Sequence, residues 1–260
     1  MKSRTVLSIL LAAAAALLCA ACSTVPPKPA EPLRVGFTPN YPPVCMERDG
    51  MPDGLEIDFA KALCKELGRP LELVELPWNQ QIDTLLAGRI DIIMSGLTAT
   101  PARSARVRFC TPYMTNPLVA MCRAGDAASL AGPDELLNTT ASVGVLDRTS
   151  AEAYVRHHFP HARIVELSRR SDAPLHLMNR RIDYYVDDFA AVANLLSAHE
   201  AQLAFLPYPL QGQNLCWAFR PDQTEFRQQC DRILARWKKS GELDAMLVRW
   251  MPYLADLRSE

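Results

Sequence analysis

The chain has 260 residues, of which 28 are Lys or Arg and 29 are Asp or Glu, so its formal net charge is −1. This balance leaves no basic surface of the kind that nucleic-acid-binding proteins carry, so no nucleic-acid partner is expected. The length is sufficient for one large domain or two modest domains with their own cores.

The N-terminus has the pattern of a secretory signal peptide. Lys2 and Arg4 precede an apolar run over residues 6–18, which is too short for a stable membrane span and meets small alanines. We therefore expect residues 1–21 to be removed, which leaves 26 basic and 29 acidic residues and a formal charge of −3. No later segment has 18 consecutive apolar residues, so the mature chain is not expected to cross a membrane.

Cys22 begins a Pro-rich segment over residues 22–32, as in bacterial lipoproteins, whose first mature residue is a lipid-bearing cysteine. The sequence thus predicts lipidation at Cys22, a tether, and membrane contact through the lipid alone. Cys19 stands where Leu or Val is usual, and the alternative is cleavage nearby and release of a soluble protein. Ser23, rather than Asp, resembles the type sorted to the outer membrane of Gram-negative envelopes.

Six cysteines follow in the mature chain, and an oxidising envelope favours disulfide bonds between them. Their spacing does not select one connectivity. The one CxxC pair, Cys19 to Cys22, straddles the cleavage site, so it indicates neither a metal site nor a redox centre. The six are Cys45, Cys64, Cys110, Cys122, Cys216 and Cys230.

Strand and helix signals alternate from residue 33 onward. Apolar runs at 33–37 and 71–76 predict strands, and the amphipathic pattern at 55–68 predicts a helix between them. A second helix over 79–87 leads into IDIIMSG (90–96), whose continuous apolar character is typical of a buried parallel strand. This βαβαβ order predicts one α/β lobe.

A second lobe repeats the scheme. It is expected to contain strands at 141–146, 163–167 and 182–188, with helices at 150–158, around 175–178 and from the last strand to residue 196. The apolar link PLVAMC (117–122) and the apolar return NLCWAF (214–219), side by side, would form a hinge. Two C-terminal amphipathic helices should pack on the first lobe. The expected divisions are therefore 33–116 with 215–260 for lobe I, and 117–214 for lobe II including the hinge strands.

The segment TATPAR predicts an anion-binding corner. Thr100 can cap a helix that begins at the following proline, so free backbone N–H groups and Arg103 would converge near Thr98. A guanidinium holds a carboxylate with two hydrogen bonds, and the backbone of Ser95 and Gly96 would add polar contacts. An ordinary surface arginine at a helix start is the alternative.

A second polar strand end, in RRIDYYVDD, offers the opposite charge. Asp187 and Asp188 suit an ammonium group, so Arg103 and one of these residues would recognise both ends of a zwitterion. A solvated loop or a helix N-cap is the alternative for the two acids. Tyr41 and Trp78 lie where a large ring can form a wall against an aliphatic ligand stem, although core packing also explains each of them.

Other motifs predict structure rather than chemistry. Thr149 and Glu152 form a capping box, and Thr149 either caps only or also touches a ligand. Three histidines at 157, 158 and 161 crowd a helix end broken by Pro160, which favours a solvated surface over a metal site. No HExxH, GxSxG or GxxxxGK motif is present, and we expect no catalytic residue, cofactor or metal.

Four segments, in their order and spacing, resemble the family 3 solute-binding proteins, the periplasmic amino-acid receptors of ABC importers. The segments are GLEIDFAKALCKELG, PWNQQIDTLLAGRIDIIMSGLTATPAR, FCTPY and RRIDYYVDD, and the similarity extends from about residue 33 to residue 254. The resemblance implies a two-lobed α/β Venus-flytrap fold, each lobe a mostly parallel sheet with flanking helices, with a two-strand hinge. It also implies a monomeric periplasmic receptor that delivers an amino acid to an inner-membrane ABC permease.

The resemblance assigns roles to residues at matching positions. It implies that Arg103 clamps the ligand α-carboxylate with Thr98, Ser95 and Gly96 as helpers, that Asp188 accepts the α-ammonium group, that Tyr41 and Trp78 are aromatic walls, and that Thr149 and Ser150 form the Thr/Ser site of the second lobe.

Three residues depart from the pattern. Ala102 replaces the usual Glu, and Arg148 replaces a Gly, where it could block the cleft, reach an acidic side chain or point outward. Thr38 replaces an Asp that receptors for polar or cationic side chains often carry, which favours a ligand other than Lys or Arg.

An enzyme on the same fold is the alternative, because periplasmic cyclohexadienyl (arogenate) dehydratases are similar to this chain too. Dehydration of a prephenate-like acid needs a general acid beside the leaving hydroxyl. Ala191 stands where those enzymes carry a carboxylate, three residues after the ammonium-binding Asp, which favours a receptor without catalysis. A sensor domain is not expected because no signalling module is attached.

Overall fold

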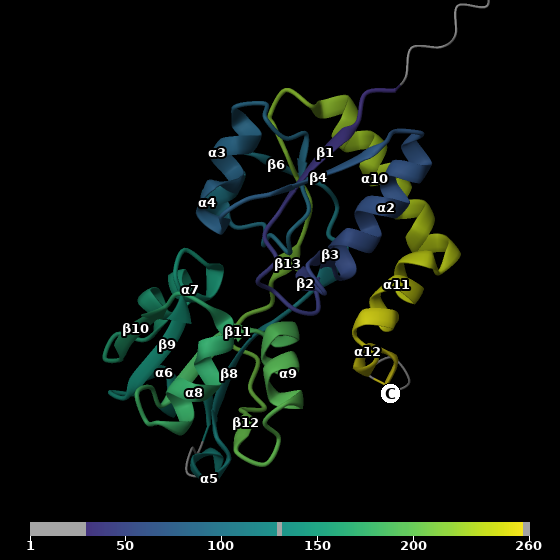
Figure 1. Cartoon of the computed structure of the whole chain (residues 1–260). Helices are drawn as coiled ribbons and strands as arrows, with labels where there is room; N and C mark the ends of the chain where they lie inside the picture. The colour runs from purple at the N-terminus through teal and green to yellow at the C-terminus, as the bar shows by residue number, and fades with distance from the viewer. Residues whose placement is uncertain (1–29, 129–131, 257–260) are drawn as a thin grey trace, which may run out of the picture. The chain divides into compact units, whose positions relative to one another are not determined.

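The computed structural model describes residues 30–128 and 132–256 (Figure 1). The chain divides into two units, Met1–Glu31 and Pro32–Glu260, and every helix and strand described below belongs to the second unit. The signal peptide and the lipidated Cys22 that the sequence predicts lie outside the described residues. Among the described helices, none has the length and apolar character that crossing a bilayer requires.

The first sheet has five strands in the order β4-β1-β5-β14-β6. Strand β1 pairs in parallel with β4 and β5, whereas β14 pairs antiparallel with β5 and β6. Strand β14 comes from far along the chain, so both ends of the sequence contribute to this lobe. The bounds are β1 Leu33–Phe37, β4 Leu71–Glu75, β5 Ile92–Ile93, β6 Arg108–Phe109 and β14 Ala218–Phe219.

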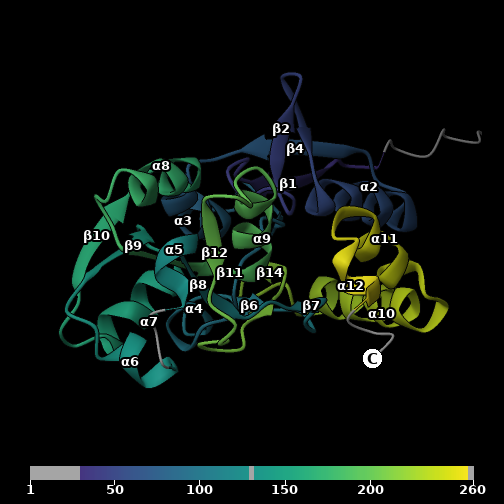
Figure 2. The same ribbon diagram turned by 90° about the horizontal axis from the view of Figure 1, so that it is seen from below.

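Helices from both ends of the sequence cover this sheet. Helix α2 (Leu55–Leu67) ends, as its pattern predicts, at Gly68, whose φ of 62° is the left-handed conformation that glycine adopts most easily. The helices at 224–240 and 242–250 pack against α2, as both views show (Figures 1 and 2). Trp237, from the first of these helices, is buried in one apolar cluster with Phe59. The other elements here are β2 Met46–Arg48, β3 Met51–Asp53, η1 Trp78–Gln80, α3 Gln81–Leu86, α4 Pro101–Ser104, α10 Thr224–Ser240, α11 Glu242–Trp250 and α12 Tyr253–Asp256.

The second sheet has the order β10-β9-β11-β8-β12. Strand β9 is parallel to β10 and β11, and β8 is antiparallel to β11 and β12, so both sheets are mixed. The strands are β8 Leu118–Arg123, β9 Ser142–Leu146, β10 Arg163–Leu167, β11 Tyr184–Asp188 and β12 Leu203–Phe205. The helices are α5 Ala124–Ala127, α6 Pro133–Leu137, α7 Ser150–His158, η2 Arg170–Asp172, α8 Ala173–Met178 and α9 Phe189–Ser197.

A short antiparallel pair links the two sheets. Strand β7 (Met114–Thr115) pairs with β13 (Asn214–Leu215) through Thr115 opposite Asn214 and Met114 opposite Leu215. The run 117–122, which was expected to lie beside 214–219, forms β8 inside the second sheet instead, and residues 214–215 pair with β7. A strand that is apolar on both faces is stable only between two neighbours. The division into lobes at 116/117 and 214/215 stays a prediction from the sequence.

The six cysteines of the described part of the chain are all buried free thiols. The expected disulfide bonds are therefore absent among these residues, and the cysteines fill the cores as small apolar side chains. Burial raises the pKa of Cys122 to about 11 and that of Cys230 to about 12, so neither thiol is ionised at neutral pH.

Candidate functional site

The ends of the strands in the two lobes meet in a polar cleft. The indole Nε1 of Trp78 donates to the carbonyl of Arg148 at 3.0 Å, and Ser150 Oγ lies 3.3 Å from Thr98 Oγ1. A cavity of about 560 Å³ lies between Arg103 and α7, and another of about 230 Å³ lies beside Trp78. Residues from both lobes line each cavity, which is the geometry of a ligand cleft.

Arg103 is held in the cleft by backbone carbonyls. Thr100 caps α4, as predicted, by accepting from the Arg103 backbone N–H at 3.3 Å. The guanidinium donates from Nη1 to the Thr98 carbonyl at 3.0 Å and from Nη2 to the Arg148 carbonyl at 3.4 Å, and its Cζ lies 5.4 Å from the Trp78 ring centroid. Within the described residues, no carboxylate approaches this guanidinium to 4.0 Å. Burial lowers the pKa of Arg103 to about 10, and the charge of Asp188 partly opposes that shift.

Among the described residues, one carboxylate oxygen of Asp188 has no hydrogen-bond partner. Its Oδ2 accepts from the Tyr41 hydroxyl at 2.7 Å, whereas Oδ1 is buried without a hydrogen bond. The residue stands at the N-cap of α9 but its side chain does not cap the helix, because Asn116 Oδ1 accepts from the Ala190 N–H instead. Burial raises the pKa of Asp188 to about 7, and the charge of Asp187 adds to the shift.

Asp187, by contrast, is saturated by protein groups. Its Oδ2 accepts from Arg170 Nε at 2.7 Å and from the Tyr185 hydroxyl at 2.6 Å, and its Oδ1 accepts from the Asp188 N–H at 2.9 Å. The side chains of Asp187 and Arg170 are 1% and 7% exposed, so this ion pair is almost wholly removed from water. Of the two adjacent acids, Asp188 alone keeps an oxygen free for a ligand.

Tyr41 contacts both lobes and requires a glycine at its side. Asn116 Nδ2 donates to its hydroxyl at 2.7 Å, and the ring is 1% exposed. Gly96 has a φ of 67°, and a Cβ there would lie 2.7 Å from Tyr41 Cε1, so a larger residue would displace the ring. The Gly96 N–H donates to Glu56 Oε1 at 2.8 Å, so it is already used within the protein.

Glu56 holds the turn at Gly96 through a hydrogen bond. Its carboxylate accepts from Gly96 N, from the Tyr113 hydroxyl at 2.7 Å and from Trp217 Nε1 at 3.0 Å, and the residue is fully buried. Burial raises its pKa to about 7, an effect that the three donors oppose. Glu56 therefore positions the turn that carries Gly96 and the neighbouring Tyr41.

Ser95 and Thr38 belong to one buried polar cluster. Ser95 Oγ accepts from the Thr38 N–H at 3.0 Å and from Gln81 Nε2 at 2.9 Å, and the Thr38 hydroxyl donates to the Leu76 carbonyl. The amide oxygen of Gln81 is buried and finds no hydrogen-bond partner in the part of the chain that the structure describes. The cluster thus brings together two residues that the sequence singles out and one, Gln81, that it does not.

Thr149 and Ser150 have different tasks. The Thr149 hydroxyl accepts from the Glu152 N–H at 3.2 Å and donates to the Leu146 carbonyl at 2.7 Å, so it is used by the backbone. Ser150 Oγ instead donates to Gln213 Oε1 at 2.7 Å, and Thr98 Oγ1 donates to the same oxygen at 3.0 Å. Gln213 therefore joins a hydroxyl from each lobe.

Arg148 contributes its backbone to the cleft. Its φ of 57° lies in the left-handed region, which explains why a glycine is expected at this position. The side chain is 64% exposed and its Nε lies 3.6 Å from Asp147 Oδ2. Of the three alternatives, the side chain points outward and reaches an acid, and the carbonyl takes the place in the cleft.

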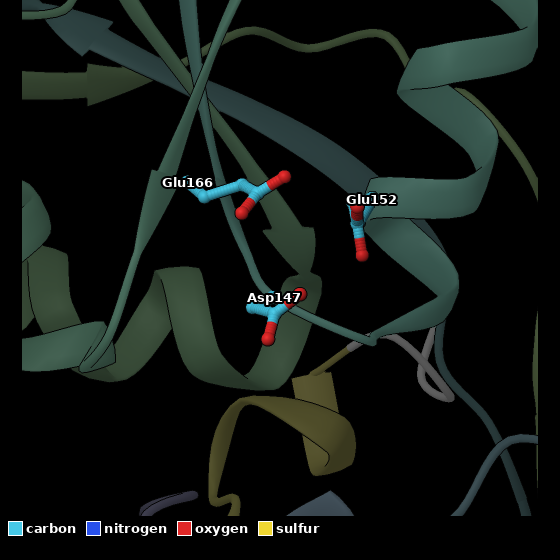
Figure 3. Close-up of side chains that lie close together, drawn as sticks. All are labelled: Asp147, Glu152 and Glu166. Carbon is cyan, nitrogen blue, oxygen red and sulfur yellow. The ribbon is translucent and has the colours of Figure 1, made fainter.

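An acidic cluster lies on the same lobe, where Asp147, Glu152 and Glu166 approach one another within 4.8 Å (Figure 3). Arg156 bridges two of these carboxylates, donating to Glu152 Oε1 at 2.6 Å and to Glu166 Oε1. The Arg148 N–H donates to the other oxygen of Glu152 at 2.7 Å. Protein donors therefore compensate the negative charge of these three carboxylates.

Sequence reasoning missed several residues of this cleft. Arg170 follows another arginine and resembles a solvated pair, and Asn116 and Gln213 lie beside the hinge without any motif. Glu56 carried a signal, because it is an acid at the start of α2 flanked by buried Leu55 and Ile57. The other missed residue is Gln81 on α3.

Comparison with known proteins decides the family. The family model for bacterial extracellular solute-binding proteins, family 3, matches residues 33–253. The chain belongs to this family. Its fold is the two-lobed Venus-flytrap fold of the amino-acid-binding proteins that it matches in structure.

Relatives of this family 3 protein bind amino acids. It is 28% identical over 231 residues to the ABC transporter arginine-binding protein 1 of Escherichia coli K12, a match that covers 86% of this chain and 92% of the relative. It is 26% identical over 222 residues to the L-cystine-binding protein TcyJ of the same strain, covering 84% and 82%. The crystal structure of the ancestral amino acid-binding protein AncCDT-1, a precursor of cyclohexadienyl dehydratase, matches with a TM-score of 0.77 and 30% identity, covering 84% and 94%.

These relatives are substrate-binding proteins rather than enzymes, which supports a family member without catalysis. The dehydratase alternative needs a proton donor near Asp188, and the residue at the relevant position, Ala191, is 2% exposed and has no proton to give.

Proposed function

We propose that this protein is a periplasmic, lipid-anchored solute-binding protein that captures a free amino acid between its lobes and delivers it to an ABC importer. The single observation that carries the proposal is a complementary pair of charged groups, one from each lobe. Arg103, from lobe I, has no counterion in the described chain, and Asp188, from lobe II, has a buried carboxylate oxygen without a partner. An α-carboxylate and an α-ammonium group satisfy these two needs together.

Capture by lobe closure follows from the origin of the two groups. Because Arg103 and Asp188 belong to different lobes, a zwitterion gains both contacts only when the lobes approach each other. The ligand then stabilises the closed arrangement by the difference in its affinity for the two arrangements. Thr98, Ser150 and Gln213 form the polar floor between the lobes, and Tyr41 and Trp78 flank the ligand.

Export and anchoring are supported by the N-terminal pattern. Its basic start, apolar run and Cys22 fit a lipoprotein signal, and Ser23 fits sorting to the outer membrane. Delivery to an inner-membrane permease is supported by relatives named as components of ABC transporters. Labelling with radioactive palmitate tests the anchor: we expect incorporation in the parent and none in Cys22→Ala.

Thermal-shift and calorimetric screens of the mature protein against the common amino acids test the binding function. At least one amino acid is expected to raise the melting temperature, and Arg103→Ala and Asp188→Asn should each abolish the shift. The matched control is Arg181→Ala, which removes an exposed arginine of lobe II and should leave the shift unchanged. Prephenate belongs in the same screen, since its turnover would move the assignment to a dehydratase.

A further inference from the structure

Arg170 reaches from lobe II to an aromatic wall of lobe I. The residue is the first of η2, and its side chain is 7% exposed. Its Nη1 donates to the Asn40 carbonyl of lobe I at 3.2 Å, and its Cζ lies 4.2 Å from the centroid of the Tyr41 ring. At this distance a guanidinium and an aromatic ring form a cation–π contact, which strengthens when water is excluded.

The same tyrosine connects Arg170 to the proposed amino-acid site. The Tyr41 hydroxyl donates to Asp188, the residue with the unused oxygen, while the Tyr41 ring supports the guanidinium of Arg170. The arginine therefore lies one side chain away from the acceptor of the ligand ammonium. A ligand side chain that leaves the Asp188 end toward Tyr41 meets a cation that the protein itself supplies.

The partner of Arg170 fixes that cation in place. Asp187 accepts from Arg170 Nε at 2.7 Å, and a second donor, the Tyr185 hydroxyl, binds the same oxygen. Because a buried ion pair with these contacts is costly to separate, Arg170 does not withdraw to admit a second cation. A lysine or arginine ligand would then place an additional positive charge beside a buried guanidinium, because Asp187 is already paired with Arg170 and Asp188 is occupied by the α-ammonium group of the ligand.

We propose that Arg170 is a specificity-determining residue: a cation built into the cleft that excludes amino acids with a cationic side chain, so that the ligand is an amino acid whose side chain carries no positive charge. The inference rests on the proposed amino-acid-binding function.

The first test uses the wild-type protein and calorimetry. Titration with arginine, lysine and the uncharged amino acids should give binding by at least one uncharged amino acid, and affinities at least about a hundredfold weaker for arginine and lysine. If arginine or lysine binds as tightly as the best uncharged ligand, the role of Arg170 is overturned while the binding function stands. If no amino acid binds, the proposed function itself is wrong, and the inference falls with it.

The second test asks whether removal of the built-in cation creates a cation site. In Arg170→Ala, Asp187 loses its counterion and the Tyr41 ring is uncovered, so guanidinium ion at about 10 mM should raise the melting temperature relative to the same concentration of NaCl. Wild-type protein should show no such rise. The matched control, Arg170→Ala with Asp187→Asn, removes the acid as well and should lose the response.

Each outcome of the second test decides the point. A guanidinium response in Arg170→Ala that is absent from the double variant supports the inference, as does a gain of arginine binding in the single variant. Equal responses in the single and double variants would contradict it. If Arg170→Ala does not fold even with guanidinium present, the wild-type titration remains decisive, because it needs no variant.

Discussion

The cleft contains two arginine–aspartate pairs that differ in one respect. Arg170 and Asp187 are in direct contact at 2.7 Å, and further donors saturate the acid. Arg103 and Asp188 influence each other's pKa but make no contact within 4.0 Å in the described chain, and one oxygen of Asp188 has no partner. The two acids are adjacent in the sequence, so their different environments come entirely from tertiary structure.

The difference indicates a division of labour. A closed, buried pair fixes the shape of the cleft, and its loss should be felt as a loss of folding stability. A separated pair contributes little to folding, and under the proposed function its interaction energy is available to a ligand that fits between the two charges. Substitutions in the two pairs should therefore have opposite effects on stability and on binding.

The largest effect is expected when the closed pair is broken. Asp187→Asn keeps the size of the side chain but leaves Arg170 buried without a counterion, so the free energy of unfolding should fall by about 3 kcal/mol or more. Urea unfolding followed by circular dichroism measures this loss. Glu66→Ala, which breaks the more exposed pair with Arg236, is the control and should cost at most about 1 kcal/mol. Equal losses would show that the buried pair has no special role.

The separated pair should respond in the reverse way. Arg103→Ala removes a cation that donates only to backbone carbonyls, so the unfolding free energy without ligand should change by less than about 1 kcal/mol. Ligand affinity should fall by about 2–3 kcal/mol, since a charge-assisted contact to the carboxylate is lost. Calorimetry and urea unfolding on the same preparation separate the two quantities. A large loss of stability with unchanged affinity would reverse the assignment of the two pairs.

The pH dependence of binding should identify Asp188. Its pKa is raised to about 7 by burial, so the carboxyl group is neutral below that pH and meets the ligand ammonium poorly. Affinity should weaken as pH falls from 8 to 5, by up to about tenfold per unit below pH 7. The folding stability without ligand should change in the opposite direction with pH. Because the pKa of Asp188 in the folded protein exceeds its ordinary value of 3.8, the contribution of Asp188 to stability is full below pH 3.8 and is lost as pH rises through about 7.

Two variants attribute this pH dependence. Asp188→Asn should bind weakly at every pH with a flat profile. Glu56→Gln is the necessary second variant, because burial raises the pKa of Glu56 to about 7 as well. If the profile is flat in Glu56→Gln and unchanged in Asp188→Asn, the titrating group is Glu56 and not the ammonium acceptor.

The smallest effect concerns the backbone that Arg103 uses. Arg148→Gly retains the carbonyl that accepts from Arg103 and Trp78 and relieves a side chain from the left-handed region. The melting temperature should rise slightly, corresponding to at most about 1 kcal/mol, because the relief is partly offset by the entropy of glycine in the unfolded chain. Ligand affinity should stay the same. A clear loss of affinity would show that the exposed side chain, and not the carbonyl, takes part in binding.

Local sequence patterns were sufficient for many of the elements. The bounds of β1, α7 and β10 follow their patterns, and Thr100 caps α4 as its position before a proline predicts. Arg103 was predicted for the same reason, since a capped helix start and a nearby arginine are adjacent in the sequence. These features depend on contacts between residues only a few positions apart.

The closed pair could not be found in this way. Whether Asp187 or Asp188 stays free depends on Arg170, which is 17 positions away from the first acid and belongs to another element. The pairing of the linking segments was missed for a related reason: the apolar character of residues 117–122 indicates a buried strand but does not say which neighbours it has. Gln213 is a similar case, because its two donors, Thr98 and Ser150, lie in different lobes.

Asn116 follows the linking strand β7 directly, and its side-chain amide makes hydrogen bonds to two different elements. Its oxygen accepts from the first turn of α9, and its nitrogen donates to the Tyr41 hydroxyl. One amide thus connects the segment that links the two sheets to α9 and to the Tyr41 hydroxyl, so a rotation about β7 would be expected to change the geometry of these bonds. If the proposed lobe closure takes place, Asn116 would limit how far the two sheets can separate without itself contacting the ligand.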